Sequence, residues 1–413
     1  MKLTAWAVEQ DGEQGRQVNL LLTVEADADA PRASVAVNLV IDRSASMRGA
    51  PLVAAVEAAQ SLVERAGPRD YLGLLAFDGV PEQLLPLRSM DGAARKAFAD
   101  RLSGLSTGAG TALHEAVELG ASAVRRVLIP GARPKLLVLT DGEPSVGPRG
   151  LPDFRTLGSR VAESGVALHA LGLGRHYLPE ILEALTTPSG TGFTHVDDPE
   201  GLSVAAATVA AELFGEVGTD ARLHVQPTGF SELHCRHRYA SRIDGDSLSA
   251  SLGALTQAVP RRALFTGRAE LAEWALSVSA TWMAGGDTRR SQVQVERVAP
   301  DSTEGRLVRA VSAELELVAA ESAAWKALVR RNTIQAEQAL KQAEACLREL
   351  VWLASEAVPA RRHVDRLGDL RVAVQHRVNE LPALVLRRAQ SANARTGVSL
   401  VEPVAIIRKL NKN

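Results

Sequence analysis

Residues 35–46 read VAVNLVIDRSAS, and this stretch decides the fold expected for the chain. The first seven residues are apolar apart from one asparagine, as in a strand that is buried on both faces of a parallel sheet. A carboxylate and two hydroxyls follow at once, on Asp42, Ser44 and Ser46. Open α/β sheets bind ligands at the carboxyl ends of their strands. These three side chains are therefore predicted to lie together at a ligand-binding edge.

A second apolar run, Leu136–Leu139, ends in the same way, in Thr140-Asp141-Gly142. Between the two runs, Thr107-Gly-Ala-Gly-Thr111 opens a predicted helix. Oxygen-bearing side chains from three loops are then expected to converge, namely Asp42, Ser44, Ser46, Thr111 and Asp141. Magnesium prefers about six oxygen ligands and often keeps waters, so a site with only two carboxylates is open to a further ligand.

The pattern Asp42-x-Ser44-x-Ser46, with Thr111 and Asp141, resembles the metal-ion-dependent adhesion site of von Willebrand factor type A domains. The resemblance covers about residues 33–215, and all five positions match. It implies that Mg²⁺, or Mn²⁺, is bound directly by the serines and directly or through water by the threonine and the aspartates. It also implies a protein partner whose Asp or Glu supplies the last ligand. Taken singly, these residues are ordinary turn and helix-cap residues.

The rest of residues 33–215 fits a doubly wound, mostly parallel sheet, because apolar runs alternate with helical stretches. The predicted strands are 35–41, 71–77, 135–140, 166–173 and 192–196. The predicted helices are 51–66, 92–103, 111–128, 152–164, 179–186 and 200–214.

From about residue 219 to 299 the apolar pattern changes to a period of two, clearest at 248–252 and 274–282. This alternation predicts antiparallel strands with one solvated face. The N-terminal segment has the same pattern, with Trp6 and Val8 before a turn at Asp11-Gly12 and further apolar residues after it.

Neither stretch alone closes a core easily. Residues 1–32 and 216–300 are therefore predicted to form one β-sandwich. The domain of residues 33–215 is inserted into it.

Residues 301–395 are predicted to be helical. Apolar residues recur at alternating spacings of three and four from Val308 to Val329 and from Ala336 to Ala354. Asn332 is positioned to cap the second helix, and a third helix is expected to begin near Pro359. Short connections favour a helical hairpin or three-helix bundle within the chain, with an intermolecular coiled coil as the alternative. Residues 396–413 form a C-terminal tail.

Composition narrows the classes of function. The chain has 413 residues, 46% of them hydrophobic, which predicts two or three domains. Its net charge of −1 argues against a general nucleic-acid or membrane partner. The N-terminus lacks a signal-peptide pattern, and no apolar run reaches 18 residues, so a cytoplasmic, bacterial-type protein is expected. Cys235 and Cys346 fall in different predicted domains and are expected to be free thiols.

Several other patterns have simpler structural explanations. Residues 104–108 match G-x-S-x-G, but a predicted helix precedes them where a nucleophile elbow needs a strand. Cys235 and His237 share one face of a strand, yet a structural zinc site needs four ligands. Residues 359–413 hold eleven Lys or Arg against four Asp or Glu, without aromatic residues for base stacking. A solvated helix face is the favoured interpretation of that segment.

The sequence thus predicts a non-enzymatic, metal-dependent protein-binding module. One alternative is a hydrolase that uses the metal as a Lewis acid, for which His114 and Glu143 are the acid–base candidates. Another is an accessory subunit of an AAA+ ATPase, because similar domains partner such motors. The oligomeric state is left open.

Overall fold

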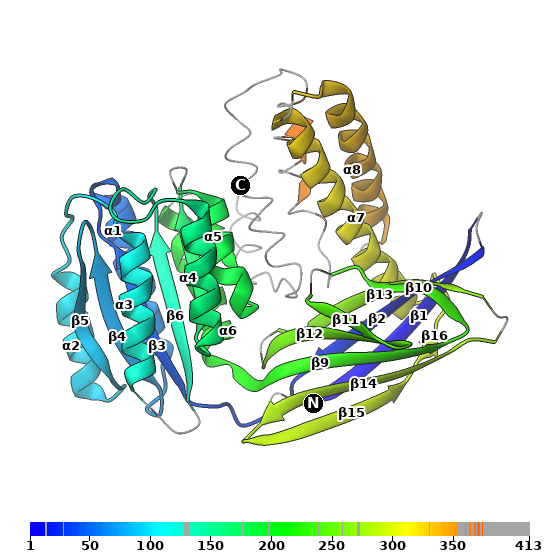
Figure 1. The fold of residues 1–413 in the computed structure, drawn as a ribbon, viewed down its shortest axis with the longest axis horizontal. Helices are drawn as coiled ribbons and strands as arrows, with labels where there is room; N and C mark the ends of the chain where they lie inside the picture. Colours follow the sequence, from blue (N-terminus) through cyan, green and yellow to red (C-terminus); the bar gives the residue numbers. More distant parts are fainter. Residues whose placement is uncertain are drawn as a thin grey trace, which may run out of the picture. The chain divides into compact units, whose positions relative to one another are not determined.

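The structure is a computed structural model that describes residues 1–12, 15–27, 29–127, 132–174, 177–196, 199–237, 239–257, 259–270, 273–329, 331–353, 360, 363–364, 367–368, 370–371 and 374. The chain forms two compact units (Figure 1). One comprises residues 1–30 together with the described residues from Val217 onward, and the other comprises residues 31–216. We call them unit 1 and unit 2.

Unit 2 is built on a six-stranded sheet in the order β5-β4-β3-β6-β7-β8. Its strands are β3 (Val35–Asp42), β4 (Tyr71–Phe77), β5 (Pro81–Ser89), β6 (Arg133–Thr140), β7 (Ala167–Leu173) and β8 (Phe193–Val196). All neighbours pair in parallel except β4 and β5. Every residue of β3 is buried, as its apolar sequence requires for a central strand. The predicted parallel sheet is confirmed.

Helices cover both faces of this sheet (Figure 1). They are α1 (Ala50–Arg65), α2 (Gly92–Ser103), α3 (Leu113–Arg126), α4 (Leu151–Glu163), α5 (Pro179–Thr186) and α6 (Pro199–Phe214), with short 3₁₀ turns η1 (Ala45–Met47) and η2 (Thr187–Ser189). On one face α1 packs against α2 and α6, and shares a core with Val37 and Leu39 of β3. On the other face Gly120 of α3 lies against Val40 and Leu136, and α4 packs between α3 and α5.

The edge strand β5 was absent from the predicted strands. Its sequence, PEQLLPLRS, contains two prolines and alternates between exposed and partly buried residues. Proline lacks a donor for the ladder and is tolerated at a sheet edge, where β5 lies with irregular register against β4. A half-exposed strand of this kind has no continuous apolar run to reveal it.

Unit 1 contains two five-stranded sheets, in the orders β10-β13-β2-β1-β16 and β11-β12-β9-β14-β15 (Figure 1). The first, sheet A, contains β1 (Lys2–Gly12), β2 (Gly15–Glu25), β10 (Phe230–Cys235), β13 (Arg261–Ala269) and β16 (Glu296–Arg297). The second, sheet C, contains β9 (Glu216–Thr228), β11 (Ser241–Asp244), β12 (Ser247–Thr256), β14 (Ala275–Ala284) and β15 (Asp287–Gln294). Apolar residues of both sheets form one core, which confirms the predicted sandwich. The two N-terminal strands lie inside sheet A rather than at its edges.

Helix α7 (Thr303–Val329) packs on the second face of sheet A, and α8 (Thr333–Leu353) packs on α7 and belongs to the same apolar cluster. The prediction of one solvated face was therefore wrong for the N-terminal strands. Trp6 and Val8 lie in the cluster with α7 and α8, whereas Ala5 and Ala7 face the sandwich core. The sequence could not reveal which element would cover that face.

The helical region packs within the chain, as predicted. Asn332 caps α8, because its side-chain oxygen accepts a hydrogen bond from Gln335 N at 3.1 Å. Leu367, Leu370 and Val374, from the predicted third helix, are buried against the same cluster. Of that predicted helix the structure also describes residues 360, 363–364, 368 and 371, whereas its other residues and the tail of residues 396–413 lie outside the described residues.

Two smaller expectations can be checked directly. Cys235 and Cys346 are both free thiols, as predicted. Among the helices that the structure describes, none combines the length and apolar character needed to cross a membrane.

Candidate functional site

The candidate site lies where the direction of winding of the unit 2 sheet reverses. Strands β3 and β6 are neighbours, with Ile41 opposite Leu139, while β4 continues on one side and β7 on the other. Asp42 ends β3, and Asp141 directly follows β6. Such switch points create a crevice at the carboxyl ends of the strands, which is where ligands bind in open α/β sheets.

Asp42 forms the buried floor of the site. Its carboxylate accepts hydrogen bonds from Ser44 N at 2.8 Å and from Thr140 Oγ1 at 2.5 Å. The first is an Asx-type turn, which lets the chain leave the strand sharply and enter η1. Thr140 was quoted in the sequence beside Asp141 but was not predicted as a site residue. Its position at the end of the neighbouring strand was the available signal.

Two serines and the second aspartate continue this network. Ser44 Oγ lies 3.0 Å from Ser46 Oγ, and Ser46 Oγ donates to Asp141 Oδ1 at 2.7 Å. Met47 in the same 3₁₀ turn is buried and belongs to the apolar core. The buried methionine anchors the turn, so that both serine hydroxyls are held beside Asp141.

Thr111 reaches the site from the loop before α3. Its backbone N donates to Ser145 Oγ at 2.8 Å, and its carbonyl accepts from Ser145 N at 3.0 Å. The loop also approaches Asp78 closely, because a Cβ added at Gly108 would lie 2.0 Å from an Asp78 carboxylate oxygen. Glycine is therefore required there by the close approach of two loops. Ser145 and Asp78 were not foreseen from the sequence.

The hydroxyls of the site surround a common space in front of Gly142. A Cβ added at Gly142 would lie 3.5 Å from Ser46 Oγ, 3.6 Å from Thr111 Oγ1 and 3.8 Å from Ser44 Oγ. The structure thus brings the five predicted residues to one edge of the sheet from three separate loops.

The electrostatics of this edge favour a bound cation. Burial raises the pKa of Asp42 to about 6, and the neighbouring Asp141 adds to that rise. The adjacent Arg43 guanidinium pairs instead with Asp78 at 3.1 Å and with Glu82 at 3.4 Å. Placing two carboxylates close together and out of water is costly unless a cation compensates them.

The chemistry of the donors also fits a hard divalent cation. All five side chains offer oxygen, which suits Mg²⁺ and Mn²⁺ and does not suit soft metals. Within the described part of the chain, no group of three or more His, Cys, Asp or Glu side chains could hold a metal. The edge described above differs from such a cluster because three of its five side chains carry hydroxyls rather than carboxylates.

The competing candidates have structural roles. The G-x-S-x-G stretch follows α2 and forms part of the loop that leads to Thr111. His114 packs edge-to-face on Phe154, with ring centroids 5.6 Å apart, and Glu143 is exposed. His237 Nδ1 accepts a hydrogen bond from Leu264 N at 2.9 Å, and burial raises the pKa of Cys235 to about 11. A thiol whose pKa is raised in this way is a poor source of the thiolate that zinc requires.

Comparison with known proteins finds a family match for the central part of the chain. The von Willebrand factor type A domain profile matches residues 37–206. An uncharacterized protein of Synechocystis sp. is 27% identical over 187 residues, which cover 45% of this chain and 43% of that protein. The match thus spans less than half of that relative.

Two solved structures resemble nearly the whole chain. A von Willebrand factor type A protein from Catenulispora acidiphila has a TM-score of 0.69 at 17% identity, covering 97% of this chain and 96% of its own. The ArnB paralog VWA2 from Sulfolobus acidocaldarius has a TM-score of 0.56 at 18% identity, with coverages of 97% and 99%. At these identities the likeness concerns the fold. The profile match identifies residues 37–206 of this chain as a von Willebrand factor type A domain.

Proposed function

We propose that this protein is a metal-dependent protein-binding module. Domains of its family often mediate protein–protein interactions. In our proposal, Asp42, Ser44, Ser46, Thr111 and Asp141 hold Mg²⁺, or Mn²⁺ in its place. An Asp or Glu of a partner protein completes the coordination. We further propose that the protein acts in the cytoplasm.

The convergence of hydroxyl and carboxylate oxygens at the switch point is the observation that carries the proposal. Ser46 Oγ lies 2.7 Å from Asp141 Oδ1 and 3.0 Å from Ser44 Oγ, so a small ion can contact all three side chains after minor rotamer changes. A bound ion would supply a strongly electrophilic centre at the surface. With neutral hydroxyls as most of its ligands, that centre favours a carboxylate from outside.

We propose binding rather than catalysis. General acid–base catalysis needs a side chain free to exchange a proton with the substrate. Of the two candidates, the His114 ring packs on Phe154, and Glu143 is a solvent-exposed carboxylate. Neither has a feature that favours the hydrolase alternative. The AAA+ alternative concerns the partner rather than the site, and identifying the partner tests it.

The experiment is affinity capture from the source cell with the full chain as bait, in Mg²⁺ and in EDTA. The natural partner should be retained in Mg²⁺ and lost in EDTA. Thr111→Ala and Ser44→Ala should also lose it, with a cost of about 2–5 kcal/mol for a buried carboxylate left without its cation. Ser103→Ala is the matched control, because the Ser103 hydroxyl is exposed and bonds only to Asp100 O. A partner retained equally in EDTA would contradict the proposal.

A further inference from the structure

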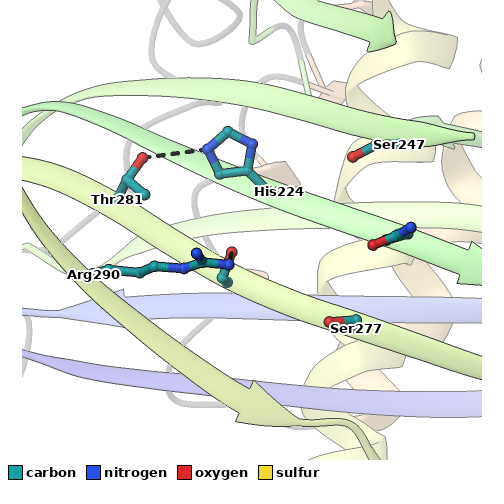
Figure 2. Close-up of a pocket in the computed structure, with 7 residues that line it drawn as sticks. His224, Ser247, Ser277, Thr281 and Arg290 are labelled. Atoms are coloured by element: carbon teal, nitrogen blue, oxygen red, sulfur yellow. Dashed lines mark hydrogen bonds between the residues drawn. The ribbon is translucent and has the colours of Figure 1, made fainter. Parts of the chain in front are cut away.

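The outer face of sheet C carries a polar pocket within unit 1. It has a volume of about 300 Å³, at the lower end of the range for ligand pockets. It is lined by His224, Gln226, Ser247, Ser277, Ser279, Thr281 and Arg290. Figure 2 shows His224, Thr281 and Arg290 on adjacent strands of the sheet.

Strand pairing builds this pocket by aligning residues that are distant in the sequence. Thr281 on β14 pairs with Arg222 on β9 and with Arg290 on β15. Two residues earlier on β14, Ser279 pairs with His224 on β9. His224 Nε2 lies 3.3 Å from Thr281 Oγ1, and an Arg290 Nη donates to Ser279 Oγ at 3.4 Å. These long contacts hold the side chains near one another while leaving most of their hydrogen-bonding capacity for a ligand.

The pocket is positively charged and lacks the features of a sugar site. None of the lining residues is acidic, and none is Phe, Tyr or Trp. Neither Arg222 nor Arg290 forms an ion pair with a described carboxylate, whereas Arg289 pairs with Asp287 at 3.7 Å. Burial lowers the pKa of His224, and the charges of Arg290 and Arg222 lower it further. The imidazole therefore lies near the positive charges of two arginines.

We propose that this pocket binds a phosphate group. The guanidinium, amide, imidazole and hydroxyl groups can all donate hydrogen bonds, and they approach from four strands. A tetrahedral dianion with several acceptor oxygens uses such an array more fully than a planar carboxylate does. The volume exceeds that of a bare phosphate and accommodates part of the molecule that carries it. This site is separate from the proposed metal site and goes beyond the function proposed above.

Calorimetry on the full chain tests the proposal, with inorganic phosphate and a phosphoserine peptide as the two probes. Divalent cations are first removed with a chelating resin, so that no metal elsewhere captures the phosphate. We expect saturable 1:1 binding of at least one probe. Binding of free phosphate would identify a site for small phosphorylated molecules or phosphate itself, and binding of the peptide alone would identify a phosphorylated protein ligand.

Variants on β15 supply the decisive comparison. Arg290→Gln removes a charge-assisted hydrogen bond and should weaken binding by about tenfold or more. Arg289→Gln removes the same charge from the adjacent residue outside the pocket, and should change affinity by about twofold at most. The His224 ring signals in NMR should shift on addition of the probe that binds. Absence of saturable binding by both probes, equal loss in the two variants, or equally tight binding of acetate would overturn the proposal.

Discussion

Lys135 Nζ lies 2.9 Å from Glu216 Oε2, and only 2% of each side chain is exposed. The lysine also donates to Leu213 O at 2.7 Å, at the C-terminal end of α6. Arg133 reaches the other carboxylate oxygen of Glu216 at 3.1 Å. This buried cluster ties the start of β6 to the residue at which the chain leaves unit 2.

Glu216→Gln should destabilise unit 2 strongly. Burial lowers the pKa of Lys135, and the Glu216 charge is the main influence that opposes this effect. Breaking a buried ion pair by removing one partner typically costs about 3–5 kcal/mol, because a charge remains buried and uncompensated. Urea unfolding followed by far-UV circular dichroism measures this cost.

The matched control is Glu118→Gln, which breaks the Arg160–Glu118 pair at the surface. Both of those side chains are about half exposed, at 53% and 51%. An exposed pair contributes about 0–1 kcal/mol. Equal losses in the two variants would show that the Lys135 cluster does not stabilise the unit.

Residues 31–216 should fold alone, whereas residues 217–413 should not. The first segment keeps Glu216 and also Arg32, which donates to both carboxylate oxygens of buried Asp70 at 2.8 Å. The second segment lacks β1 and β2, which are internal strands of sheet A. Exposed apolar strand edges would then promote aggregation.

Fluorescence distinguishes the two units, because all five tryptophans belong to unit 1. The intact chain should show a cooperative tryptophan transition in urea. A similar transition in residues 217–413 alone would contradict the insertion of unit 2 into a single sandwich.

Acid should destabilise unit 1 through His237. Burial lowers the pKa of His237 from 6.5 to about 4. Between these values the unfolded chain binds a proton that the folded chain excludes, so stability falls as the pH falls through this window. The loss approaches about 3 kcal/mol at its lower end.

His237→Asn provides the comparison, since its amide oxygen can accept from Leu264 N and does not titrate. The variant should be less stable at pH 7, and its deficit should shrink toward pH 4. Tryptophan-monitored urea unfolding at several pH values measures the difference. A deficit that is constant with pH would assign the acid response to other groups.

The parallel sheet could be predicted from the sequence because its parallel strands are continuous apolar runs. Such runs are typical of strands that are buried on both faces of a sheet. The positions of Asp42 and Asp141 followed from the same runs, since parallel strands end at one edge. Both inferences depend on local pattern together with a single topological rule.

Features that depend on distant partners were not predicted. The orientation of Trp6 depends on α7, which lies about 300 residues later in the chain. The pocket at His224 requires the register of β9, β14 and β15. The sequence of one strand alone does not show which side chains of the adjacent strands will lie beside its own. Thr140 was missed as a partner of Asp42 although its place at the end of the neighbouring strand was an available signal.

Calorimetric titration of the metal-free protein with Mn²⁺ and Mg²⁺ tests the central claim most directly. The wild-type chain should bind one ion weakly, because the partner's carboxylate is absent from the shell. Asp42→Ala should abolish binding, and so should Asp42→Asn, which keeps an oxygen for Ser44 N but removes the charge. Glu143→Ala, an exposed neighbour outside the proposed ligand set, should bind as the wild type does. Unchanged metal binding in both Asp42 variants would contradict the proposed site.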